Sequence, residues 1–311
     1  MSSLLTYHQY DSIQFIWRAR IDRKYLNPTS GQCTQALTSA ARHSDVHIAT
    51  DVFRILSERG TAFASHHYEL LMSAHLGAGD LRTALTILCI MHSVQLHPDL
   101  ETLSALRTYL FSDSAAPQKA FEMLKQLATE RDVPTVAVNA IIMSLVDHNR
   151  HADVISTYKS LHQLSSAGPN VHTFNALFRS CHRNNDKRTA MFFAAEMVEL
   201  KIRPDALTYD RLVLVCIREA DYEDAWRYYG EMTQAGYVPR LGTFVTMVQV
   251  CADAKDERAL ELVERMVELG LPTVSVQKAV RAAWPERVEE LPFVGDRGMG
   301  SVSLGGKAIR V

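Results

Sequence analysis

Apolar residues in this chain recur at the spacing of an α-helix. One face of a predicted helix at 208–218 carries Tyr209, Leu212, Val213, Cys216 and Ile217, at i, i+3, i+4, i+7 and i+8. A short polar break at 219–221 separates this helix from a second one, predicted at 222–234. Strict alternation of apolar and polar positions, the pattern of a half-buried strand, does not occur. The pattern therefore predicts an all-α protein.

This pair of helices recurs with a period of about 35 residues. The separations are 36, 35, 35, 35 and 33 residues between Pro98, Pro134, Pro169, Pro204, Pro239 and Pro272. Similar openings follow, such as Thr173-Phe174-Asn175 and Thr208-Tyr209-Asp210, and Gly236 before Pro239 suits a left-handed helix cap. The register predicts units at 30–64, 65–99, 100–135, 136–170, 171–205, 206–240 and 241–273, with 274–285 as the first helix of a closing unit.

A small residue marks the predicted crossing point of the two helices in six of these units, and a larger apolar residue follows seven positions later. The small residues are Ala49, Ala84, Ala120, Ala190, Ala225 and Ala259, and the larger ones are Leu56, Met91, Leu127, Met197, Met232 and Met266. Stacked pairs of this kind predict a right-handed α-solenoid of about seven helix-turn-helix repeats over 30–285. Residues 1–29 are interpreted as a cap or a truncated half-repeat, and 286–311 as a flexible Gly-rich tail.

The composition excludes several classes of protein but indicates no catalytic or metal site. The chain has 311 residues, 47% of them hydrophobic and 22% charged, with a formal net charge of −2. These values exclude a disordered chain and give no global basic signature for nucleic acid, and no apolar run is long enough to span a membrane. Five cysteines without a CxxC pair predict no disulfide framework and no metal site. Cys181, Cys216 and Cys251, spaced at the repeat period, are expected to be buried thiols. Since no catalytic or phosphate-loop motif occurs, the sequence predicts no enzyme and no cofactor.

The 35-residue period, the Thr-aromatic-Asn/Asp openings, the crossing alanines and the Glu196-Met197 and Glu231-Met232 pairs together resemble pentatricopeptide repeats. The resemblance implies a solenoid whose first helices line a concave face and bind single-stranded RNA, about one base per repeat. It also implies a mitochondrial location, although residues 1–10 contain no arginine and are weak as a targeting signal. Whether the chain is a piece of a longer array stays open.

In pentatricopeptide repeats, two residues of each repeat read a base. Carried onto this sequence, Asn175 with Asp205 implies a uridine reader, and Asn139 with Asn170 implies a pyrimidine reader that favours cytidine. The two pairs lie in adjacent repeats, so the expected core of the RNA is pyrimidine-uridine. The remaining pairs match no defined base: Thr34 with Ala64, Glu69 with Asp99, Ser104 with Thr135, Asp210 with Arg240, and Val245 with Thr273.

The resemblance also implies residues that clamp bases and residues that meet phosphates. The expected clamps are Val136, His172 and Leu207, and the expected phosphate contacts are Arg183 and Arg218, which are 35 residues apart. Simpler roles stay open at this point: Asn139 and Asn175 as helix N-terminal caps, His172 as a surface histidine, and both arginines as solvated helix ends.

Together these observations predict a non-catalytic protein that binds single-stranded RNA and supports the processing, stability or translation of mitochondrial transcripts. The alternative is a protein-interaction scaffold whose concave face holds a protein partner, for example of the mitochondrial ribosome. The small net charge and the many undefined base-reading pairs keep this alternative open.

Overall fold

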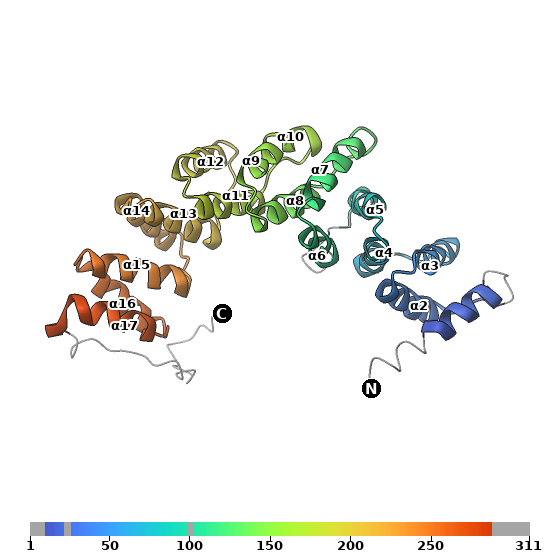
Figure 1. Ribbon diagram of the computed structural model, residues 1–311, viewed down its shortest axis with the longest axis horizontal. Coiled ribbons are helices and arrows are strands. Elements are labelled where there is room, and N and C mark those ends of the chain that lie inside the picture. Colours follow the sequence, from blue (N-terminus) through green and yellow to red (C-terminus); the bar gives the residue numbers. More distant parts are fainter. Residues whose placement is uncertain (1–9, 22–25, 97, 99–102, 288–311) are drawn as a thin grey trace. The chain divides into compact units, whose positions relative to one another are not determined.

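The computed structural model describes residues 10–21, 26–96, 98 and 103–287, and every regular element in them is a helix (Figure 1). The chain divides into two compact units, residues 1–180 and 181–311, and each is described by itself. Of the tail predicted at 286–311, residues 288–311 lie outside the described part, as does Asp99. Within that part, no helix is long and apolar enough to cross a lipid bilayer.

The first unit begins with a helix at 10–16 that continues into a π-helical turn, η1 (Trp17–Ile21), and goes on as helix pairs. Its helices are α2 (Ser30–His43), α3 (Val46–Glu58), α4 (Ser65–Gly77), α5 (Leu81–Ser93), α6 (Ser104–Ser112), α7 (Ala116–Leu127), α8 (Thr135–Asp147), α9 (His151–Lys159), α10 (Leu161–Leu164) and most of α11 (Val171–Asn184).

The second unit begins with the last turn of α11, from Cys181, and has the same alternation of first and second helices. Its helices are α12 (Lys187–Glu199), α13 (Ala206–Arg218), α14 (Tyr222–Gln234), α15 (Leu241–Asp253), α16 (Arg258–Glu268), α17 (Val274–Ala283) and the 3₁₀ turn η2 (Pro285–Arg287). The all-α repeat fold is thereby confirmed, and α14 has the bounds that the hydrophobic pattern predicts.

Tight turns join the two helices of a repeat, and an aspartate begins the second helix in several of them. The residue before the aspartate has a left-handed backbone, as at Ser44 with φ 58° and Ala220 with φ 56°. The aspartate then caps the helix: Asp45 accepts from the Ile48 N–H at 3.1 Å, and Asp221 from the Asp224 N–H at 3.2 Å. These polar breaks therefore start a new helix as well as ending the old one.

The predicted helix crossings are the core of both units. All six crossing alanines are at most 2% exposed, and so are the six larger residues that follow them. Cys181, Cys216 and Cys251 are buried and unpaired with one another, as predicted. Burial raises the pKa of the Cys216 thiol to about 12, so this thiol packs as a small uncharged residue.

Repeat 136–170 departs from the others because its second helix is broken. Ser160 separates α9 from the single turn of α10, whereas other repeats have one continuous helix. This repeat also lacks the crossing alanine: Ile155 stands 35 residues before Ala190, and Val154 takes the fully buried place. The break therefore coincides with the one repeat in which a branched residue replaces the small one.

We expect Ala225→Leu to destabilise the protein by about 1–3 kcal/mol, because the extra side chain overpacks a crossing that is only 2% exposed. Urea denaturation measures the effect. Ala195→Leu is the control, because Ala195 lies on the exposed face of α12 and leucine is also a good helix former. Equal unfolding midpoints for the two variants would show that the crossing is assigned to the wrong residue.

Candidate nucleic-acid interface

In the first unit, the two predicted readers Asn139 and Asn170 contact each other. Asn139 Nδ2 donates to Asn170 Oδ1 at 3.1 Å, and Thr173 Oγ donates to Asn139 Oδ1 at 2.7 Å. Thr173 also receives a bond from the Asn170 N–H at 3.1 Å. Asn139 is 5% exposed and Thr173 is fully buried, so these bonds fix the orientation of the Asn139 amide.

The second unit contains the same arrangement with different side chains. Asp210 Oδ1 accepts from Thr243 Oγ at 2.7 Å and from the Arg240 N–H at 3.2 Å. The Arg240 guanidinium lies 3.5 Å from Asp210 Oδ2, an oxygen that is buried and has no hydrogen bond. Burial raises the pKa of Asp210 above its ordinary value, because the charged form loses its hydration.

The threonine in this arrangement was not predicted from the sequence. The signal was present, because threonines recur 35 residues apart, each two positions before the first residue of a base-reading pair. They are Thr173, Thr208 and Thr243. The structure shows that such a threonine orients the reader of the preceding repeat: Thr173 bonds Asn139, and Thr243 bonds Asp210. The reader and its threonine lie in consecutive repeats, and a period alone does not reveal such a contact.

In two repeats the closing residue, Asn170 or Asp205, caps the next helix with its side chain, and the fifth residue of the helix does not. Asn170 Oδ1 accepts from the Thr173 N–H at 3.1 Å, and Asp205 Oδ1 from the Thr208 N–H at 2.8 Å. Asn139 and Asn175 are the fifth residues of α8 and α11, inside the helices. The interpretation of Asn139 and Asn175 as N-terminal caps is therefore wrong.

The predicted pair Asn175 and Asp205 is divided between the two units. Asn175 lies in the first unit and is 3% exposed, whereas Asp205 begins α13 in the second unit. The three predicted clamp residues each precede a reader by three positions: His172 is exposed, and Val136 and Leu207 are half-buried. Their roles toward a base stay predictions.

Basic side chains gather in the second unit around His182. Arg183 and Arg218 are exposed in the last turns of α11 and α13, and Arg211 lies two turns before Arg218 on the same face of α13. Burial, followed by the charges of Arg218, Arg183 and Arg211, lowers the pKa of His182. This cluster suits an anion, and Arg211 was not predicted as part of it because its proximity depends on neighbouring helices.

The corresponding position of the preceding repeat is acidic. Asp147 stands eight residues after Asn139, as Arg183 stands eight residues after Asn175. Asp147 Oδ1 pairs with Arg179 Nη2 at 2.8 Å. The arginines at this position in the next two repeats, Arg183 and Arg218, therefore have no counterpart in repeat 136–170.

Comparison with known families decides what the repeats are. The model described as "pentatricopeptide repeat-containing protein" matches residues 30–161, and the model for the pentatricopeptide repeat domain matches 166–219 and 193–254. The chain belongs to the pentatricopeptide repeat family. No curated protein matches the sequence of this pentatricopeptide repeat protein.

Similar solved structures are those of the pentatricopeptide repeat protein PPR10. The complex of PPR10 with an 18-nt psaJ RNA element has a TM-score of 0.44 and 15% identity, over 88% of this chain and 45% of that one. PPR10 from maize has a TM-score of 0.34 and 15% identity, over 83% and 46% of the two chains. This pentatricopeptide repeat protein therefore spans less than half the length of these structures.

We expect Thr173→Val to destabilise the protein by about 1–3 kcal/mol, because it leaves the Asn139 oxygen and the Asn170 N–H short of a buried partner. Urea denaturation measures this loss. Thr246→Val is the control, because the Thr246 hydroxyl donates only to the Gly242 carbonyl of its own helix at 2.8 Å. A loss no larger than that of the control would show that the Thr173 bonds contribute nothing.

Proposed function

We propose that this pentatricopeptide repeat protein binds single-stranded RNA along its first helices and does no chemistry on it. The observation that carries the proposal is the Asn139–Asn170–Thr173 arrangement, where a buried threonine holds an amide at a base-reading position. A pre-oriented amide binds a base edge without first losing side-chain entropy. The family membership of the chain supports the same use of these positions.

The chemistry of the readers suits pyrimidines. An amide offers two N–H donors and a carbonyl oxygen with two lone pairs, and the bonds within the arrangement use only some of them. The pair Asn139/Asn170 therefore presents both donors and acceptors to the Watson–Crick edge of a pyrimidine. By resemblance, Asn175 with Asp205 reads uridine, so we infer a pyrimidine-uridine core, with Val136, His172 and Leu207 beside the bases.

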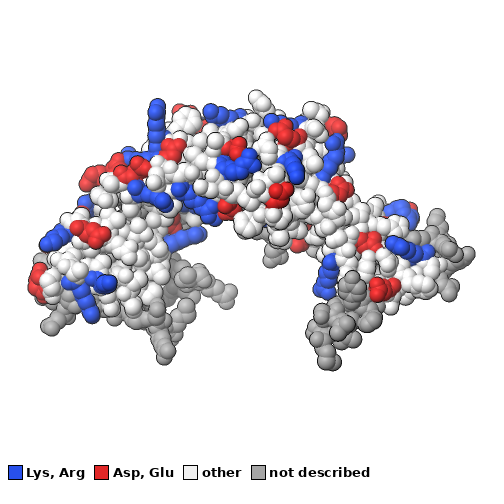
Figure 2. All heavy atoms as spheres, in the orientation of Figure 1, with Lys and Arg blue, Asp and Glu red and all other residues white. Residues whose placement is uncertain are grey.

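Charge supports local rather than global attraction to RNA. Acidic and basic side chains are interspersed on the face shown in Figure 2, in keeping with the net charge of −2. The cluster of Arg183, Arg211 and Arg218 is the local exception, and we assign it to phosphates. Repeat 171–205 carries six Lys/Arg against four Asp/Glu. The repeat with this excess of basic residues therefore also contains the predicted base-reading pair Asn175 and Asp205.

The biological setting follows from the resemblance alone. We propose a mitochondrial location and a role in the processing, stability or translation of transcripts there. Subcellular fractionation of the tagged full chain tests the location.

A second candidate function, a protein-interaction scaffold, is favoured by one observation. On α12, Phe192 is 64% exposed and Val198 is 72% exposed, and neither belongs to the proposed RNA path. Exposed apolar groups of this size on a second helix suit contact with another protein.

Replacing Arg183 or Arg218 by glutamine should weaken binding to all RNA sequences alike, because a phosphate contact carries no base information. The slope of log K against log salt should fall by about 0.7 for each arginine replaced. Fluorescence anisotropy over a salt series measures the slope, with Arg188→Gln as control, since Arg188 is exposed on the second helix of the same repeat. A changed base preference at an unchanged slope would contradict the assignment.

Selection from a randomised RNA pool tests the base-reading assignment. The parent protein should enrich a pyrimidine-uridine step, and Asn175→Ala should flatten the preference at the second position only, by about 1–3 kcal/mol. Gln163→Ala, which removes an exposed amide on α10, should leave both preferences intact. If the parent enriches no such step, the base-reading assignment falls and the scaffold becomes the preferred function.

A further inference from the structure

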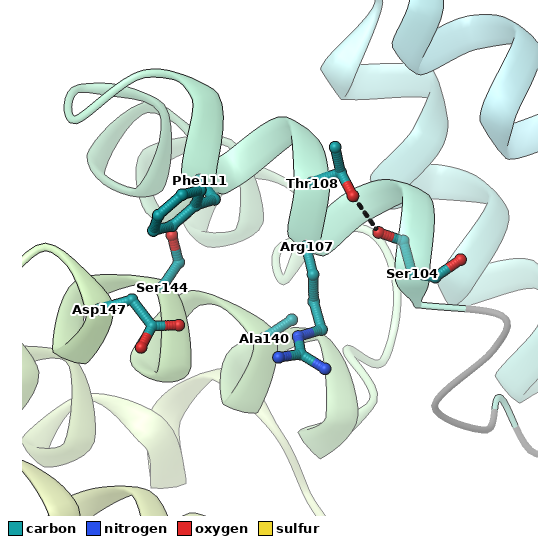
Figure 3. A pocket seen from close by; sticks show the side chains of 7 residues that line it. All are labelled: Ser104, Arg107, Thr108, Phe111, Ala140, Ser144 and Asp147. Atoms are coloured by element: carbon teal, nitrogen blue, oxygen red, sulfur yellow. Dashed lines mark hydrogen bonds between the residues drawn. The ribbon is translucent and has the colours of Figure 1, made fainter.

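A pocket of about 330 Å³ lies between α6 and α8, the first helices of consecutive repeats in the first unit (Figure 3). Helix α6 contributes Ser104, Arg107, Thr108 and Phe111, and α8 contributes Ala140, Ser144 and Asp147. Ser104 belongs to the pair Ser104 with Thr135, which matches no defined base, and the other six residues belong neither to a base-reading pair nor to the arginine cluster. The pocket therefore extends from a base-reading position on the surface along which we propose that RNA binds.

Hydrogen bonds between the helices hold the pocket in shape. Ser144 Oγ donates to the Leu110 carbonyl at 3.0 Å, and His148 Nε2 lies 3.2 Å from the same oxygen. These contacts join the C-terminal turn of α6 to α8 and to His148, the residue that follows α8. The walls are thus fixed before any ligand arrives, which lowers the entropic cost of binding.

The pocket combines an aromatic ring with charges of both signs. The Phe111 ring is 61% exposed and stacks on His148, with centroids 5.5 Å apart and an interplanar angle of 22°. Arg107 and Asp147 lie on opposite sides of the pocket in Figure 3, with Ala140 and Ser144 between them. Within the described residues no side chain pairs with the Arg107 guanidinium, whereas Asp147 pairs with Arg179.

We propose that this pocket binds a guanine base of the RNA strand. Guanine is flat enough to stack on Phe111, and it offers the acceptors O6 and N7 to the fork of Arg107. Its N1–H and N2–H₂ donors, on another edge, suit the carboxylate of Asp147. Uracil has one N–H and cytosine one amino group for that carboxylate, and adenine has one amino group with the acceptor N1 beside it. A phosphate could meet the Arg107 guanidinium but has no ring to stack on Phe111.

The pocket gives repeat 100–135 a base preference that its closing residue does not supply. Thr135 is 8% exposed, and its hydroxyl donates to the Gly168 carbonyl at 2.8 Å and lies 3.0 Å from Ser165 Oγ. Its polar atom is therefore already engaged inside the unit. The guanine would neighbour the pyrimidine read by Asn139, on the side away from the uridine, so the inference rests on the proposed function.

The experiment compares short RNAs that differ only at this neighbouring position, with the full chain and anisotropy as readout. Guanosine should bind roughly tenfold or more tightly than the other three bases. Substitution by 7-deazaguanosine removes N7, and inosine removes the amino group, so each should weaken parent binding several-fold. Arg107→Lys should bind guanosine and 7-deazaguanosine equally, and Asp147→Asn should bind guanosine and inosine equally. Arg82→Lys, an exposed arginine on the second helix α5, should behave as the parent.

Two outcomes would overturn the guanine pocket while leaving the proposed function intact. One is a parent that selects the pyrimidine-uridine step but no guanosine beside it. The other is a guanosine preference that survives in both Arg107→Lys and Asp147→Asn. A parent that binds no single-stranded RNA would instead contradict the proposed function itself.

Discussion

The close crossing of two helices at an alanine is the contact on which the rest of this protein depends. A helix pair of 35 residues has no core of its own, so each pair buries its apolar faces against its neighbours. The crossing alanines bring the two helices of a repeat together, and the Leu or Met seven residues later fills the next layer. Because the same contact recurs, the first helices of successive repeats present corresponding positions, and a residue number predicts a place on the surface.

This regularity explains why the fold was predictable. The period, the crossing alanines and the thiols at the repeat spacing describe local environments that recur in each unit, and the structure confirms their burial. The break at Ser160 was not predictable from periodicity, because it lies in the repeat where Ile155 stands at the crossing position. Where a repeat departs from the consensus, local side-chain packing determines whether its second helix is continuous.

The candidate site was only partly predictable, because its geometry joins different repeats. The sequence pointed to Asn139 and Asn170, but the role of Thr173 depends on a bond to a side chain 34 residues away. Arg211 and Asp147 were not predicted for the same reason. Arg211 lowers the pKa of His182, and Asp147 pairs with Arg179, and in both cases the partner lies on a neighbouring helix. Side-chain direction across a repeat boundary determines such contacts, and a single repeat pattern does not contain it.

The lowered pKa of His182 would give the proposed RNA binding a proton linkage. Burial, followed by the charges of the surrounding arginines, lowers the pKa of His182 and so disfavours its imidazolium form. A polyanion that arrives at those arginines screens their charges and adds a favourable field, which shifts the equilibrium toward imidazolium. By reciprocity, the proposed association with RNA would take up a proton, and acidification would strengthen the complex.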